Sequence, residues 1–318
     1  MASSGRLRSL RFAAADADCW AVQKRDRKEV TLNKKTSVLV LSVLAMALLL
    51  VASFSGIILD DGGSPYLFTS LRGEAVDIYG GKGLYQYDSV YKAVLFRGFD
   101  WANLIVGIPL LAWGMYLYQR RQLRGQLLIA AVFTYLAYNY GIGVMGNAFN
   151  VMFLVWTALF SVGLFGLALL LPGIDISSFP EKQGVNFPRR SLSVYVVILG
   201  LFLLVQYLAE IFTAYGSGKP PASLGVYTTL ELAALELGIM IPLHIFGGIL
   251  LWKQEAAGYL LAIILTFTAF MTFISLSISL LIFYFLFEMG SVFDVMVPII
   301  LAVVATAFSI VIFRRVKN

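Results

Sequence analysis

The sequence predicts an all-α integral membrane protein with about eight transmembrane helices. Of its 318 residues 59% are hydrophobic and only 13% are charged, whereas soluble domains are about half apolar and a quarter charged. The apolar residues form separate stretches, each near the ~20 residues that a helix needs to cross a bilayer. A third observation, an internal similarity between two parts of the chain, divides these helices four and four.

The predicted helices follow one another with mostly short polar connections. The first and the last consist mainly of Leu, Val, Ile and Ala, and the seventh is long enough to tilt or to extend past the membrane. The predicted spans are residues 36–59, 100–119, 125–145, 150–171, 191–214, 228–252, 258–287 and 293–313.

Two segments outside the helices have a distinct composition. Residues 1–35 are polar and basic, and we expect a mostly disordered cytoplasmic tail. Two alternatives stay open: a targeting segment, or a cleaved signal peptide with residues 38–50 as its apolar core, which would leave seven helices. The outer loop 60–99 is rich in Gly and Tyr and is expected to form a small cap over the outer face.

The basic residues predict the orientation of the helices. With both termini in the cytoplasm, 19 of the 24 Lys and Arg residues lie in cytoplasmic segments, as the positive-inside rule requires. The acidic residues are distributed oppositely, so the inner side carries a net charge of +12 and the outer side a net charge of −6. The basic pI therefore describes a cytoplasmic face beside anionic lipid, and the lipid bilayer is the expected partner. No nucleic-acid-binding module accompanies these charges.

An internal similarity links two helix pairs at a constant offset of 133 residues. Residues 107–131 and 240–264 align without a gap and share eight of 25 positions. The shared residues include Pro109 and Pro242. Each proline removes a backbone hydrogen bond and is expected to kink its helix.

This similarity predicts a 4+4 parallel repeat. The first half comprises residues 36–172, the second half residues 191–318, and residues 173–190 form a cytoplasmic linker. In many transporters the binding site lies at the interface between such repeats. Duplication of a scaffold with no transport role explains the similarity equally well.

Polar side chains inside the predicted helices indicate where a site would lie, because such groups are costly in a membrane. Asn103 and Glu236 each lie six residues before the shared proline and are predicted to face one pocket. A hydrogen bond to a neighbouring helix is the alternative for Glu236. His244 lies on the same side of its helix as Glu236, and it either continues a proton path or bonds a carbonyl freed by the proline. The predicted ligand-binding residues are Asp100, Asn103, Tyr138, Asn139, Asn150, Glu210, Glu231, Glu236 and His244.

The sequence predicts neither a metal site nor a cofactor. One cysteine, Cys19, and one histidine, His244, argue against a disulfide, a thiolate metal cage and bis-histidine haem ligation. No H-E-x-x-H, G-x-S-x-G or P-loop string occurs, so an embedded enzyme using Glu231 and Glu236 is the least favoured class.

Short strings in both halves of the chain carry a family resemblance. The strings are Arg97-Gly98-x-Asp100, Pro109-Leu110-Leu111, Arg120-Arg121-Gln122-Leu123, Tyr138-Asn139-Tyr140, Ala148-Phe149-Asn150, Phe187-Pro188-Arg189-Arg190 and Gly258-Tyr259. In them the chain after residue 36 resembles a family of uncharacterised bacterial multi-pass membrane proteins with no assigned activity. The resemblance implies a bacterial cytoplasmic membrane and transfers no catalytic residue. The tail before residue 36 departs from the family pattern.

Two functional classes therefore lead. The first is a transporter-like protein with an outward-facing acidic pocket for a cation, an amine or a proton-coupled solute. The second is a non-transporting sensor, assembly factor or accessory subunit. A cavity that touches Glu236 would favour the first.

Overall fold

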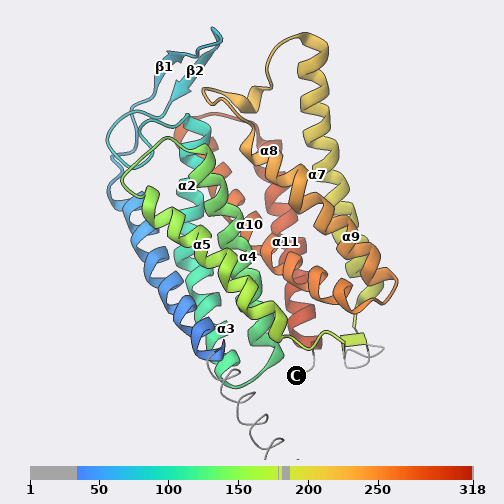
Figure 1. Cartoon of the computed structure of the whole chain (residues 1–318). Helices are drawn as coiled ribbons and strands as arrows, with labels where there is room; N and C mark the ends of the chain where they lie inside the picture. The colour runs from blue at the N-terminus through green and yellow to red at the C-terminus, as the bar shows by residue number, and fades with distance from the viewer. Residues whose placement is uncertain (1–33, 178, 181–186, 317–318) are drawn as a thin grey trace, which may run out of the picture.

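The computed structural model describes residues 34–177, 179–180 and 187–316. The predicted tail of residues 1–35 therefore lies almost wholly outside the described residues, as does part of the predicted linker 173–190. Within the described part, eight helices are long and apolar enough to cross a membrane. The predicted all-α architecture with eight spanning helices is confirmed, and the one sheet among the described residues is a two-stranded hairpin (Figure 1).

The spanning helices run alternately between two faces of the bundle (Figure 1). The face that carries the hairpin is called the cap face, and the face with the turns at 120–122 and 253–255 is called the far face. The elements are the N-terminal helix Lys34–Ile58, β1 (Tyr66–Thr69), β2 (Ala75–Ile78), α2 (Val90–Ala102), η1 (Asn103–Gly107), α3 (Ile108–Gln119), α4 (Leu123–Gly146), α5 (Phe153–Leu170), α7 (Arg189–Ser217), α8 (Glu231–Leu235), η4 (Glu236–Met240), α9 (Ile241–Trp252), α10 (Ala256–Phe287) and α11 (Val292–Arg315).

The second spanning helix begins earlier than the sequence predicts. It was expected at 100–119, but α2 begins at Val90, where Ser89 caps the helix by accepting a hydrogen bond from a backbone N–H of its first turn. The expected outer loop 60–99 therefore ends at residue 89, and the prediction was wrong there. Charged side chains in the first turns of α2 lower its hydropathy, and the structure neutralises them with partners that the sequence pattern does not show.

Residues 59–89 form a small cap that is tied to the bundle. Strands β1 and β2 pair antiparallel, with Tyr66 opposite Ile78. At the base of the cap Arg97 of α2 lies 2.7 Å from Asp60 and donates to the hydroxyl of Tyr79, 2.8 Å away. The Tyr79 hydroxyl in turn donates to Asp60 at 2.8 Å. These contacts tie the cap to α2.

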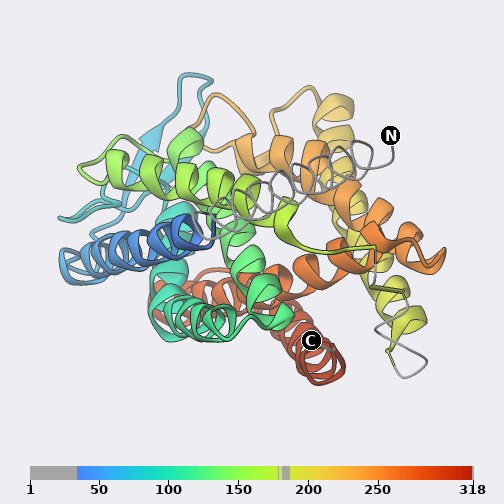
Figure 2. The same ribbon diagram turned by 60° about the horizontal axis from the view of Figure 1, so that its bottom comes forward.

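Helices α4 and α10 lie at the centre and are packed against each other. Helix α4 packs along α3 and α5, and α10 packs along α9 and α11. Helices from the two halves of the chain also pack on each other, because α2 packs on α10 and α8 packs on α4. Residues 127–133 of α4 are buried throughout, so the core of the bundle follows this helix. Figure 2 shows the first-half helices on one side of this centre and the later helices on the other.

The two helical segments that contain the shared prolines Pro109 and Pro242 have the same local structure. In each, a five-residue π-helical segment, η1 or η4, ends directly before the Ile-Pro pair that begins α3 or α9. A proline has no N–H to donate, so the turn before it is free to widen. The following turns also agree, because Arg121 and Gln254 both have a positive φ, 61° and 65°. All these features recur at the predicted offset of 133 residues.

Two glycines explain why these turns are so tight. A Cβ atom on Gly125 would lie 2.3 Å from the backbone nitrogen of Tyr118, and one on Gly258 would lie 2.1 Å from that of Leu251. A larger residue at either position would force the helices of the turn apart. The similarity between the two segments thus extends from sequence to backbone packing.

Candidate ligand-binding cavity

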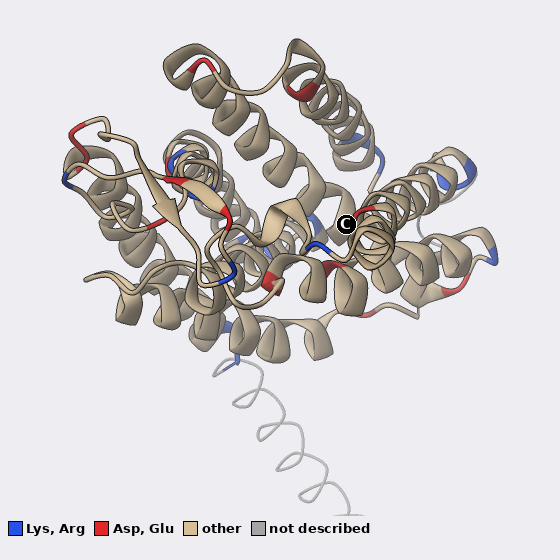
Figure 3. Cartoon of the chain, turned by 90° about the horizontal axis from the view of Figure 1, so that it is seen from above, with Lys and Arg blue, Asp and Glu red and all other residues tan. Residues whose placement is uncertain are grey.

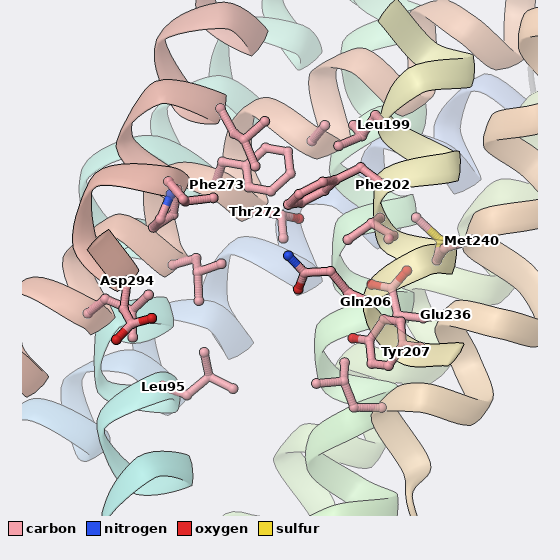
Figure 4. A pocket seen from close by; sticks show the side chains of 18 of the residues that line it. Leu95, Leu199, Phe202, Gln206, Tyr207, Glu236, Met240, Thr272, Phe273 and Asp294 are labelled. Carbon is pink, nitrogen blue, oxygen red and sulfur yellow. The ribbon is translucent and has the colours of Figure 1, made fainter. Parts of the chain in front are cut away.

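A cavity of about 430 Å³ lies between α7 and α11, with α10 as its floor (Figure 4). Helices α2, α4, α8 and α9 and the segment η4 also contribute to its wall. Most of its lining is aliphatic or aromatic, and no Lys or Arg lines it among the residues that the structure describes. Its side chains with polar groups are Tyr91, Tyr138, Gln206, Tyr207, Glu236, His244, Thr268, Thr272 and Asp294.

The cavity exists because α7 and α11 diverge toward the cap face. Near the far face the two helices meet, where the ring of Tyr195 stacks on that of Phe308 at a centroid distance of 4.6 Å. Nearer the cap face, Gln206 of α7 and Asp294 of α11 stand on opposite sides of the cavity (Figure 4). The aromatic stack thus holds α7 against α11 on the far-face side of the cavity, and neither ring lines the cavity itself.

Glu236 places a buried carboxylate in the wall of this cavity. It is the first residue of η4 and is 7% exposed. Its Oε1 accepts a hydrogen bond from the hydroxyl of Tyr138 on α4. Its Oε2 has no hydrogen-bond partner among the described residues. Because a buried carboxylate is costly without partners, this oxygen is the strongest indication of a missing donor.

His244 lies one helix segment deeper, on α9. Its Nδ1–H donates to the carbonyl oxygen of Met240 at 2.7 Å, whereas its Nε2 is buried without a partner in the described part of the chain. Gly200 of α7 leaves the space for this side chain, because a Cβ there would lie 2.9 Å from that of His244. The imidazole Nε2 is therefore a second buried polar atom of the cavity lining without a partner among the described residues, in addition to Oε2 of Glu236.

The polar residues of the first-half helix have a different environment. Asp100 accepts a hydrogen bond of 2.6 Å from the hydroxyl of Tyr85, a residue of the cap. The amide of Asn103 donates to Ser53 at 3.3 Å and to Tyr140 at 3.2 Å. Neither Asp100 nor Asn103 lines the cavity. The structure thus does not bring Asn103 and Glu236 to one pocket.

The remaining predicted residues divide between the cavity and local roles. Glu231 forms an ion pair with Lys92, with 2.5 Å between Nζ and Oε1. Glu210 accepts from a loop N–H at 2.8 Å, and Asn150 accepts from a backbone N–H at 2.9 Å. Asn139 is buried, and its amide atoms have no partner among the described residues. The predicted residues that line the cavity are Tyr138, Glu236 and His244.

Sequence reasoning did not select six of the polar residues that line the cavity, namely Tyr91, Gln206, Tyr207, Thr268, Thr272 and Asp294. Gln206 and Tyr207 lie in the middle of α7, and no spacing distinguishes them from other polar residues of a membrane helix. Asp294 follows Ser291 in a Ser-x-x-Asp string that predicts a helix cap, and the structure contains that cap, with 2.7 Å between the two side chains. The helix packing alone places these residues at the cavity.

A second polar cluster joins the two halves at the cap face. Lys92 of α2 donates to Glu231 and to the carbonyl oxygen of Gly146, 2.6 Å away, and its ammonium lies 3.6 Å from the ring centroid of Tyr227. The Tyr227 hydroxyl donates to Asp88 at 2.8 Å. Burial raises the pKa of Asp88 to about 6, although the hydrogen bonds that it accepts and the charge of Lys92 oppose this shift. These contacts connect α2 with the segment before α8, although Oδ2 of Asp88 is buried without a hydrogen-bond partner among the described residues.

Comparisons with family models, with curated proteins and with solved structures found no match for this chain. Among residues 34–177, 179–180 and 187–316, no group of three or more His, Cys, Asp or Glu side chains is placed to hold a metal ion. The chemistry of the cavity is therefore the basis for function.

Proposed function

We propose that this polytopic membrane protein is transporter-like and binds a small organic cation or amine in the cavity between α7 and α11. The observation that carries the proposal is Glu236, a buried carboxylate with one oxygen free of partners among the described residues. A protonated amine would supply both the charge and the hydrogen-bond donor, whereas an organic cation without an N–H would supply the charge alone. A proton on Glu236 would satisfy the same oxygen, so release of the cation could be coupled to proton uptake.

The rest of the lining supports a ligand that is apolar apart from its charge. The rings of Phe99, Phe202, Phe273 and Phe283 line the cavity, and aromatic faces attract cations by about 0.5–2 kcal/mol. No Lys or Arg of the described chain lines the cavity to repel such a ligand. A volume of about 430 Å³ falls within the ~300–1,000 Å³ that is typical of small-molecule sites.

A 4+4 parallel repeat is part of this proposal, with residues 36–172 and 191–318 as its halves. The equal offset of the π-helical segments, prolines and tight turns supports it. The exchange of helices supports it too, because α2 packs on α10 of the other half and α8 packs on α4. A two-fold axis between α4 and α10 would relate both contacts and would leave the cavity beside that axis.

The distribution of charge supports a cap face on the outside and both termini in the cytoplasm. Acidic residues predominate in the cap and at the cap-face ends of the helices, and the helix bodies are almost free of charge (Figure 3). In this orientation the cavity would open to the outside, and the bacterial cytoplasmic membrane that the sequence resemblance implies is part of the proposal. The described basic residues of the far face are Lys34, Lys35, Arg120, Arg121, Arg124, Arg189, Arg190, Lys253, Arg314 and Arg315.

A second candidate is a ligand sensor, or another non-transporting subunit, that binds the same class of ligand. The stack of Tyr195 on Phe308 favours it, because this contact joins α7 to α11 between the cavity and the far face. In a transporter the same contact would be the gate that opens in the alternate state. Flux measurements separate the two candidates.

The test uses tetraphenylphosphonium, a lipophilic cation, with the purified protein in nanodiscs. We expect saturable binding that falls at least about tenfold in Glu236→Gln, the loss that corresponds to ~1.4 kcal/mol. Glu210→Gln is the matched control, because this carboxylate lies on α7 outside the cavity and is expected to leave binding unchanged. Absence of binding, or equal binding by wild type and Glu236→Gln, would refute the proposal.

Proteoliposomes then decide between the two candidates. Uptake of the cation that depends on Glu236 supports a transporter. Binding that depends on Glu236, together with flux no greater than in empty liposomes, overturns transport and supports the sensor.

A further inference from the structure

The open cavity has a counterpart in the first half. Asn103 and Glu236 are the first residues of η1 and η4, and Tyr140 of α4 corresponds to Phe273 of α10 at the same offset of 133 residues. Phe273 lines the same cavity as Glu236, and the hydroxyl of Tyr140 accepts a hydrogen bond from the amide of Asn103. The equivalent space in the first half therefore lies next to Asn103, and Asp100 lies one helical turn before Asn103, at the position that corresponds to Ala233.

That space is filled by Tyr85 from the cap. Its ring is 1% exposed and is stacked on that of Trp156 of α5, with the centroids 6.1 Å apart and the planes at 21°. The ring of Phe96 lies at the same distance on another side. The Tyr85 hydroxyl donates to Asp100 at 2.6 Å, and Gly56 leaves the room for this pair, since a Cβ there would lie 1.8 Å from the Asp100 carboxylate. An aromatic ring with a donor thus occupies the first-half space and faces a buried carboxylate.

The second half has no such occupant. The loop that precedes its proline-containing helix runs over residues 218–230, whereas the cap runs over residues 59–89. None of the residues 218–230, all of which are described, lines the cavity. The tyrosine of this loop, Tyr227, turns instead to Asp88 of the cap. The carboxylate of Glu236 therefore faces an open space where the first half has a tyrosine side chain.

We propose that the ligand of the open cavity has the chemistry of Tyr85: a flat aromatic ring whose hydrogen-bond donor faces the carboxylate. Because Glu236 would be satisfied by a charged donor, the ligand class is an aryl-alkyl amine in its protonated form. The inference rests on the proposed function and narrows it from organic cations to those with an aromatic ring. The rings of Phe99, Phe273 and Tyr207 are the candidate stacking partners.

The discriminating experiment compares two amines that differ in the aromaticity of their ring. 2-Phenylethylamine and 2-cyclohexylethylamine have the same carbon number and the same ammonium group, but only the first has an aromatic ring. Their binding to the full-length protein in nanodiscs is measured by displacement of tetraphenylphosphonium. We expect the aryl amine to bind about tenfold more tightly, the equivalent of one stacked ring and ~1.4 kcal/mol. General partitioning predicts the opposite order, because the saturated ring is more hydrophobic.

The outcomes separate this inference from the function on which it rests. Equal or tighter binding of the cyclohexyl amine would overturn the aromatic ligand while the cation site stands. If tetraphenylphosphonium itself does not bind, both the proposed function and the inference that rests on it are refuted. Glu236→Gln is expected to weaken the aryl amine at least about tenfold. An unchanged affinity of the aryl amine in that variant would overturn the predicted contact with the carboxylate.

A variant of the cap tests the equivalence directly. Tyr85→Ala vacates the first-half space and leaves Asp100 without its donor. We expect this variant to bind 2-phenylethylamine at a second position, so that the stoichiometry doubles relative to wild type, whereas Tyr85→Phe keeps the ring and the wild-type stoichiometry. An unchanged stoichiometry in monodisperse Tyr85→Ala would overturn the equivalence of the two spaces.

Discussion

Replacement of Lys92 by methionine should weaken the connection between the two halves more than any exposed substitution. Lys92 and its partner Glu231 have side chains that are 11% and 9% exposed. The change removes the ion pair, the hydrogen bond to Gly146 and the contact with the ring of Tyr227, but it keeps an unbranched side chain of similar length. Because a buried carboxylate is then left without its cation, we expect a loss of about 3–5 kcal/mol in the free energy of unfolding.

Unfolding by sodium dodecyl sulfate in mixed micelles, followed by tryptophan fluorescence, measures this loss. The double variant Lys92→Met/Glu231→Gln should recover at least about 1 kcal/mol relative to Lys92→Met, since the unpaired charge is gone. Lys219→Met on the same face is the control for an exposed lysine, with an expected change within about 0.5 kcal/mol. If Lys92→Met is no less stable than Lys219→Met, the buried pair does not connect the halves.

Three further predictions concern the cap face, the core and the orientation. Since the pKa of Asp88 is raised to about 6 from 3.8, the free energy of unfolding should fall by roughly 3 kcal/mol as the pH rises from about 4 to about 6, and Asp88→Asn should remove this slope in unfolding titrations. Gly98→Ala should destabilise the bundle by about 1–3 kcal/mol, because its Cβ would lie 1.9 Å from a serine of α10, whereas Gly216→Ala, with nothing within 4 Å, should be neutral or slightly stabilising. In a variant without the native cysteine, Gly73→Cys should react with a membrane-impermeant maleimide on intact cells and Lys253→Cys only after lysis; the reverse pattern would refute the orientation.

Hydropathy predicts the helices well wherever no charge interrupts them. Helix α10 was expected at 258–287 and runs over Ala256–Phe287, because every residue of that stretch suits a bilayer. Helix α2 was missed by ten residues at its start, since Lys92 and Arg97 look like loop residues. Their charges are neutralised by partners from distant parts of the chain. Hydropathy summed over a window of neighbouring residues does not include such partners.

The sequence predicts how deep the candidate residues lie along their helices, but it does not predict which neighbouring helices their side chains face. The offset of 133 residues places Asn103 and Glu236 at the same height before their prolines, and both are buried in the structure. Equal height does not fix what surrounds a residue, because that depends on which helices pack beside it. Asn103 meets Ser53 of the N-terminal helix, whereas Glu236 meets the gap between α7 and α11.

The difference between these two environments comes from the loops that precede the helices. In the first half the cap is long enough to insert Tyr85 and to seal the space beside Asp100. In the second half residues 218–230 stay outside the cavity, so the carboxylate of Glu236 keeps an open side. If the halves are related by duplication, one site lost its access and the other kept it. A ligand is then expected in the half whose space is open, and Glu236 is the residue that it would contact.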